Sequence, residues 1–263
     1  MDQSPPESLP EAVRQAAEAG DMETVNAWLR TEPDVNAQGL DNEGRPLLWL
    51  VGRGTINAAH VDLARRLLAL GADVNAKYRM NEVTVLHCAS CGRGPQASEM
   101  VRLLLLNGAD VNARTRLGGW TPMAYFPVYA HTYQNDDVPI NQRAPRGDLL
   151  VICKLLLQAG ASIDDVVSTS GWHQDTSMEA RLEEYATNDD EWLAVKRLVA
   201  DVRAAGGTYR SYLHEHRKQV LTLRCLATKK GRAKTTDPVM NFLVKLGDNG
   251  VIWKVLGFWP PPP

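Results

Sequence analysis

The sequence predicts an all-α protein: a solenoid of stacked helix pairs joined by short β-hairpin fingers, with a small helical cap at its C-terminal end. Three observations support this fold class. A leucine-rich stretch ending in Gly-Ala-Asp-Val-Asn-Ala occupies 103–113 and recurs almost unchanged at 67–76. Looser copies lie at 34–37 and 155–164. A second motif follows each copy at a constant distance, so both motifs belong to one repeating unit.

Each copy has the composition of a helix end followed by a turn. Gly71, Gly108 and Gly160 follow the leucine-rich stretches, and glycine readily adopts the left-handed conformation that ends many helices. The Asp and Asn residues behind the glycines favour turns, because their side chains bond to nearby backbone groups. We therefore expect one continuous apolar core to join the leucines that precede the glycines, namely Leu67, Leu104 and Leu156.

The second motif begins 11 residues after the first, from Asp34 to Arg45, Asp73 to Thr84, Asp110 to Thr121 and Ser162 to His173. Thr-Val-Leu-His at 84–87 and Thr-Pro-Met-Ala at 121–124 resemble the Thr-Pro-Leu-His start of an ankyrin repeat. With Gly-Ala-Asp-Val-Asn-Ala in the correct order, these motifs make the chain resemble an ankyrin-repeat protein with a C-terminal helical extension. The resemblance covers roughly residues 9 to 209, and the third repeat matches best.

The chain then divides into a flexible leader at 1–7, an array of about five irregular repeats at 8–209, and a helical tail at 210–263 that ends in a proline run. The first helix pair has no hairpin before it, as expected of a terminal repeat that covers only one side. Apolar residues at helical spacing predict later helices at 46–51, 61–70, 86–91, 100–106 and 148–158. Fingers are expected at 38–44, 77–83, 114–120 and 166–172.

The fourth unit departs most from the regular period. Successive Asp-type positions are 39, 37, 52 and 46 residues apart, against about 33 in an ordinary ankyrin unit. The extra residues of the fourth unit fall at 125–146, and the prolines and aspartates there predict an excursion loop. Four aromatic residues either anchor this loop or expose an aromatic patch, namely Tyr125, Phe126, Tyr129 and Tyr133. The acidic run at 188–191 is expected to cap a helix and not to bind a metal.

The composition, with 44% hydrophobic residues and a net charge of -2, is typical of an ordinary soluble protein. We expect neither nucleic-acid nor membrane binding from this balance. The first residues lack the apolar core of a secretory signal, and four unevenly placed cysteines do not suggest a disulfide framework. A reducing compartment, cytoplasm or nucleus, is therefore expected.

Candidate chemical motifs favour structural explanations. His87-Cys88-Ala89-Ser90-Cys91 contains a Cys-x-x-Cys, but a structural zinc site needs four ligands. Ankyrin proteins use a histidine at the His87 position to brace neighbouring turns. His214 and His216 are two apart and would point to different sides of a helix. Without a phosphate-binding loop or a nucleophile motif, we expect no enzyme activity, cofactor or metal.

The tail carries two further resemblances and one basic run. Leu221 and Cys225 have the spacing of a SOCS box, which in some ankyrin proteins recruits a ubiquitin-ligase adaptor. The segment 259–263 resembles an aromatic-plus-proline ligand for polyproline-reading domains. The basic run at 229–234 favours a solvated turn over a nuclear-import signal or a nucleic-acid-binding patch.

The ankyrin resemblance implies partner binding on the finger tips and the concave face. The leading hypothesis is a non-enzymatic protein–protein interaction scaffold that is monomeric by itself and binds a protein partner, with an acidic segment as the candidate ligand. The alternative is a substrate-receptor adaptor of a ubiquitin ligase that acts through the SOCS-box-like tail. Arg, Tyr and Trp often dominate interface energetics, although Trp120 and Trp172 could instead serve in ordinary finger packing. The predicted protein-binding residues are Lys77, Tyr78, Arg79, Met80, Arg114, Arg116, Trp120 and Trp172.

Overall fold

The computed structural model describes residues 9–31, 33–38, 44–132, 148–164, 178, 182–183, 189–215 and 217–218. The chain divides into two compact units, Met1–Val199 and Ala200–Pro263. The predicted leader at 1–7 lies outside the described residues. The predicted limit of the repeat array at residue 209 stays a prediction, because compact units and repeats are different divisions of a chain.

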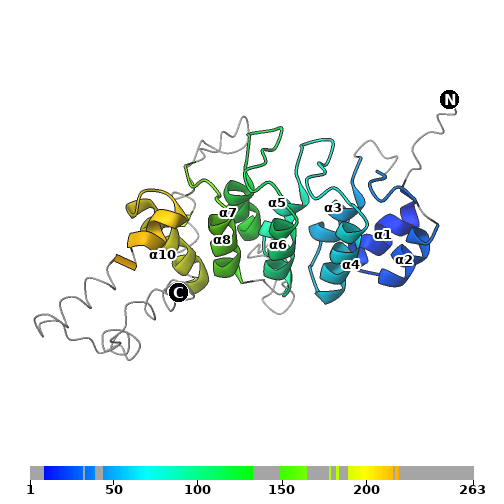
Figure 1. Cartoon of the computed structure of the whole chain (residues 1–263), viewed down its shortest axis with the longest axis horizontal. Helices are drawn as coiled ribbons and strands as arrows, with labels where there is room; N and C mark the ends of the chain where they lie inside the picture. Colours follow the sequence, from blue (N-terminus) through cyan, green and yellow to red (C-terminus); the bar gives the residue numbers. More distant parts are fainter. Residues whose placement is uncertain are drawn as a thin grey trace, which may run out of the picture. The chain divides into compact units, whose positions relative to one another are not determined.

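The first unit is a stack of helix pairs (Figure 1). In the described part of this unit, the helices with defined bounds are α1 (Glu11–Ala19), α2 (Met22–Leu29), α3 (Leu47–Arg53), α4 (Ala58–Ala69), α5 (Val85–Ser90), α6 (Ala97–Leu106), α7 (Pro122–Thr132), α8 (Leu149–Gln158) and the first part of α10 (Asp190–Ala204). Within the stack, α1, α3, α5 and α7 pack successively on one another, and α4, α6 and α8 form a parallel series. None of the helices in the described ranges has the length and apolar character needed to cross a membrane.

The second helices of the pairs share one core. Leu67 on α4, Leu104 on α6 and Leu156 on α8 are each 0% exposed. Since α4 packs on α6 and α6 packs on α8, these leucines belong to one continuous apolar seam. The arrangement confirms the expectation of a common core.

Glycines close these helices as predicted. Gly71, Gly108 and Gly160 have φ of 91°, 85° and 93°. After α4, the N–H of Ala72 donates to the carbonyl of Leu67 at 3.0 Å, and that of Gly71 donates to Leu68 at 3.1 Å. Equivalent pairs of bonds end α6 and α8. This bonding pattern is the Schellman motif, in which a left-handed residue turns the chain out of the helix.

An asparagine ladder connects successive repeats. The Asn75 side chain accepts from the N–H of Asp110 at 2.8 Å and donates to the carbonyl of Gly108 at 3.2 Å. Asn36 makes the same two bonds to the repeat after it, and so does Asn112. The Asp side chains accept locally, for example Asp73 from the N–H of Asn75 at 2.8 Å. Aspartate thus shapes each turn and asparagine joins the turn to the next repeat.

The turns between the paired helices also meet across repeats. The N–H of Ile56 donates to the carbonyl of Arg93 at 2.9 Å, and the N–H of Gln96 donates to the carbonyl of Ile56 at 3.1 Å. Gly94 lies at this junction with φ of 90°, and a Cβ on it would come within 2.3 Å of the Ile56 backbone. Only glycine fits this position.

The fourth unit starts with an anchored aromatic pair. Phe126 on α7 is 0% exposed and packs on Trp192 of α10, with 5.4 Å between ring centroids. Asp189 caps α10 by accepting from the N–H groups of Glu191 and Trp192, as the acidic run predicted. Tyr125 is half-buried. Most of the predicted excursion at 125–146 lies outside the described residues, since their next segment begins at 148.

In the second unit, the described residues include a helix at 209–215. Thr208 caps this helix, because its Oγ1 accepts from the N–H of Ser211 at 3.1 Å. The rings of Tyr209 and Tyr212 stack with 5.6 Å between centroids. The helix agrees with a helical start to the tail, and residues 219–263 lie outside the described part.

Candidate functional site: the finger face

Two loops project from the same side of the stacked helices, one between α4 and α5 and one between α6 and α7 (Figure 1). We call them the second and third fingers. The second finger is fastened by an isolated antiparallel bridge between Lys77 and Thr84. Inside it, the N–H of Tyr78 donates to the carbonyl of Val83 at 2.9 Å, and Glu82 takes a φ of 59°. The predicted hairpin is therefore present and very short.

The third finger is closed around Thr115. The N–H of Thr115 donates to the carbonyl of Trp120 at 3.0 Å, and its Oγ1 accepts from the N–H of Trp120 at 2.9 Å. The N–H of Arg116 donates to the carbonyl of Asn81 in the second finger at 2.8 Å. This backbone bond fixes the two fingers side by side, so residues of both can contact one partner.

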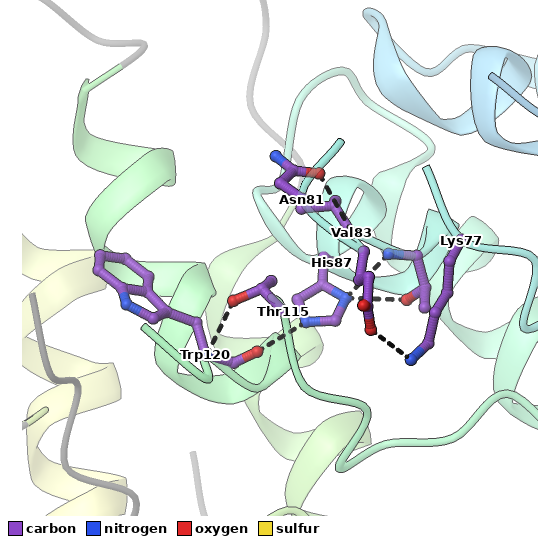
Figure 2. A network of polar contacts seen from close by, with 8 residues as sticks. Lys77, Asn81, Val83, His87, Thr115 and Trp120 are labelled. Atoms are coloured by element: carbon purple, nitrogen blue, oxygen red, sulfur yellow. Dashed lines mark hydrogen bonds and ion pairs between the residues drawn. The ribbon is translucent and has the colours of Figure 1, made fainter. Parts of the chain in front are cut away.

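A buried histidine joins the base of the second finger to the third (Figure 2). His87 is 0% exposed. Its Nδ1 accepts from the N–H of Thr84 at 3.2 Å and lies 2.8 Å from the Thr84 Oγ1. Its Nε2 lies 3.0 Å from the carbonyl oxygen of Trp120. Because a carbonyl can only accept, Nε2 carries the proton and the ring is neutral.

Burial explains the neutral state of this ring. Desolvation lowers the pKa of His87 from 6.5 to about 4, and the hydrogen bond to the Trp120 carbonyl offsets only part of that effect. His60 makes a similar bridge one repeat earlier, with its Nε2 3.1 Å from the carbonyl oxygen of Glu18. These histidines brace the repeats, as the resemblance implied for His87.

Comparison with protein families agrees with this geometry. Residues 13–115 match the family model for ankyrin repeats in three copies. Residues 13–115 are ankyrin repeats. Over the described residues, the predicted all-α stack of helix pairs is confirmed. Ankyrin repeats generally mediate protein–protein interactions and are typically non-enzymatic. A comparison with curated proteins found no match.

The second and third fingers expose most of the predicted contact residues. Met80, and Leu117 next to Arg116, are large apolar side chains that are 55% and 70% exposed. Tyr78 is half-buried. The exposed cations of the two fingers are Lys77, Arg79, Arg114 and Arg116.

These cations differ in the ion pairs and hydrogen bonds that they already form within the chain. Lys77 pairs with Glu82 at 3.0 Å, and Arg114 donates to the carbonyl of Gly119 at 3.0 Å. Arg79 and Arg116 form no ion pair with any residue in the part of the chain that the structure describes. These two guanidinium groups therefore have the most donor capacity left for a partner.

The structure gives different results for the two tryptophans that were predicted to bind a partner, Trp120 and Trp172. Trp120 is only 8% exposed and packs with Ala124 and Tyr125 in one apolar cluster. Its side chain thus serves finger packing, the alternative that the sequence left open, and offers little area to a partner. Trp172 lies outside the described residues.

Sequence reasoning missed an aromatic residue at the base of the second finger. Trp49 of α3 contacts Tyr78 with 5.0 Å between ring centroids. The position of Trp49 within the repeat could have identified it from the sequence. Trp49 comes immediately after the four-residue motif that opens at Arg45, and Cys88 and Tyr125 occupy the equivalent positions in the next two repeats.

The Cys-x-x-Cys is structural. Cys88 and Cys91 are free thiols, and burial raises the pKa of both, to about 12 for Cys88. A metal ligand or redox nucleophile must be a thiolate, which these environments disfavour. Among the described residues, no cluster of three potential metal ligands occurs. The SOCS-box-like pair Leu221 and Cys225, the basic run and the terminal prolines lie outside the described residues.

Proposed function

We propose that the chain is a non-enzymatic protein–protein interaction scaffold and that it binds an acidic segment of a partner protein on the second and third fingers. The backbone bond between Arg116 and Asn81 supports the proposal most strongly, because it makes one surface from two fingers. We call this surface the finger face and define it by Tyr78, Arg79, Met80, Arg116 and Leu117.

The side chains of the finger face are of the kinds that bind a protein partner. Met80 and Leu117 supply exposed apolar area that a partner can desolvate, and Arg79 and Arg116 supply cations beside it. Interfaces commonly combine an apolar centre with a polar rim, and arginine and aromatic residues are enriched at their hot spots. Lys77 and Arg114 add positive charge to the rim, where charge mainly raises the association rate.

We further propose that the chain works as a monomer, without a cofactor, in the cytoplasm or nucleus. Cys88, Cys91 and Cys153 are free thiols, which fits a reducing compartment. This compartment also suits a scaffold whose repeats use buried thiols as small apolar side chains.

The test begins by capturing partners on the immobilised chain and identifying them by mass spectrometry. The dissociation constant of each is then measured for the wild type and for the double variant Arg79→Glu with Arg116→Glu. Reversal of two interface charges is expected to raise the dissociation constant about a hundredfold. Unchanged affinity for every captured partner would reject the finger face as the site.

The matched control is Arg65→Glu with Arg102→Glu. Both arginines are exposed, on the second helices α4 and α6, where they pair with Asp62 and Glu99. The control makes the same change in net charge away from the fingers. It should leave affinity within about threefold of the wild type.

A further inference from the structure

A cluster of arginine and aromatic side chains lies next to the finger face. The guanidinium carbon of Arg45 is 5.9 Å from the ring centroid of Trp49 and 5.8 Å from that of Tyr78. The guanidinium carbon of Arg53 is 5.4 Å from the Trp49 centroid. These distances are those of cation–π contacts, so the aromatic rings restrain two arginine side chains at one place.

The cluster is continuous with the finger face. Trp49 and Arg53 are four residues apart on α3 and therefore lie on one face of that helix. Tyr78 contacts this face through Trp49 and directly precedes Arg79 and Met80 in the second finger. A ligand that contacts the finger tips and extends towards the helices would therefore also contact this face of α3.

We infer that Arg45 and Arg53, held by Trp49, form the second side of the recognition site and bind carboxylates of the partner's acidic segment. We call this group the arginine wall. The inference rests on the proposed function, because the same segment would contact the finger face. A guanidinium binds a carboxylate through two parallel N–H donors, and restraining the side chain beforehand reduces the entropy lost on binding.

The positions of the two guanidinium groups also limit how far apart the acidic residues of the ligand can lie in its sequence. Both guanidinium groups lie beside one indole ring, so two carboxylates close together in sequence can reach them. An extended segment advances about 3.3 Å per residue, which places the two acidic residues within about four positions of each other. Arg53 currently pairs with Glu18 at 3.1 Å, and both side chains are substantially exposed. Such exposed pairs contribute little stability, so a partner carboxylate can replace Glu18.

The burial of Trp49 favours a protein ligand over a nucleic acid. Single-stranded nucleic acids bind by stacking their bases on open aromatic faces beside basic residues. Trp49 is only 6% exposed, because its ring supports the arginines and is not open to a base. An acidic peptide needs only the guanidinium donors.

The experiment selects ligands from a random peptide-display library, with segments of about 12 residues, on the immobilised full-length chain. The selected peptides are then synthesised with a fluorescent label, and their dissociation constants are measured by anisotropy. We expect selected peptides to contain two acidic residues within about four positions. A pool without acidic enrichment, or no selection above background, would overturn the inference. Tighter binding of a labelled single-stranded oligonucleotide than of the peptides would also overturn it.

Variants locate the binding. Arg45→Gln with Arg53→Gln should raise the dissociation constant about tenfold or more, whereas Arg65→Gln with Arg102→Gln should not change it. Glu18→Gln should tighten binding, because it removes the carboxylate that competes for Arg53 while leaving both arginines in place. A wall variant that binds as well as the wild type, or a Glu18 variant without tighter binding, contradicts the inference.

The finger variant distinguishes failure of the arginine wall from failure of the proposed function. If Arg79→Glu with Arg116→Glu loses the peptides and the wall variant keeps them, the arginine wall is wrong and the proposed function stands. If both variants bind like the wild type, both proposals fail. Circular dichroism and urea unfolding check that each variant is folded, and Glu18→Gln decides the question if the wall variant is not.

Discussion

Mild acid should weaken the repeat stack through His87. Its Nδ1 accepts from the N–H of Thr84, and protonation would place a proton against that donor. The pKa of His87 is about 4 in the folded chain, against 6.5 for an ordinary histidine. Between these values the unfolded chain binds a proton that the folded chain does not, so stability falls as the pH falls through this window.

The size of the effect follows from the pKa difference. Well above pH 6.5 the ring is neutral in both states, so it causes no loss of stability. At pH 5 the unfolded ring is almost fully protonated and the folded ring almost fully neutral, which removes about 2 kcal/mol of stability. Below the folded pKa of about 4 both states are protonated, so the loss stops growing.

Urea unfolding at pH 7 and pH 5, followed by circular dichroism, measures this effect when the wild type is compared with His87→Gln. Glutamine is polar but does not titrate, and the carboxylates contribute almost equally to both proteins. At pH 7 the variant should be the less stable, since it loses the bridge to the Trp120 carbonyl. The difference in unfolding free energy should shrink by about 2 kcal/mol at pH 5. A difference that stays constant would refute the argument that His87 is buried neutral.

Two further predictions concern the contacts between repeats. Gly94→Ala should cost about 3 kcal/mol or more in thermal unfolding, because its Cβ would strike the Ile56 backbone. Gly108→Ala should cost only about 1 kcal/mol, since its φ is also positive but its Cβ meets open space; equal losses would argue against the close approach at Gly94. Asn75→Ala should cost about 1–3 kcal/mol in urea unfolding, because it breaks both bonds to the next repeat. Asn107→Ala, which breaks only a bond within its own helix end, should cost less than about 0.5 kcal/mol, and a comparable loss there would contradict the ladder.

The features that depend on local chemistry were predictable from the sequence. Gly71, Gly108 and Gly160 take the left-handed conformation wherever a helix must end, and Asp73 caps its own turn. These events involve neighbours in the chain, so each repeat predicts them independently. Recurrence of the pattern then predicted the stack and its common core.

The ladder that Asn75 makes to the next repeat was not predicted. Its partners, Gly108 and Asp110, are 33 and 35 residues away in sequence. The recurrence of Asn at 36, 75 and 112 was visible, but the chemistry of a turn already accounted for it. A second role becomes apparent only when the stacking distance between repeats is known.

The finger face was predicted in outline and changed in detail. Exposure of Met80 and Arg79 follows from their position at a finger tip, which repeat register supplies. Burial of Trp120 depends on contacts with Ala124 and Tyr125, and the importance of Trp49 depends on Tyr78 in the following repeat. Register places such side chains on a face but does not determine which neighbour covers them.

Site-specific photo-crosslinking reports directly which face of the stack the partner touches. A benzophenone amino acid would replace one exposed apolar residue at a time. Met80 and Leu117 probe the finger face, and Leu70 and Leu106, 53% and 80% exposed at the ends of α4 and α6, are matched controls. We expect partner crosslinks from positions 80 and 117 and none from 70 and 106. Crosslinks from 70 and 106 alone would contradict this expectation.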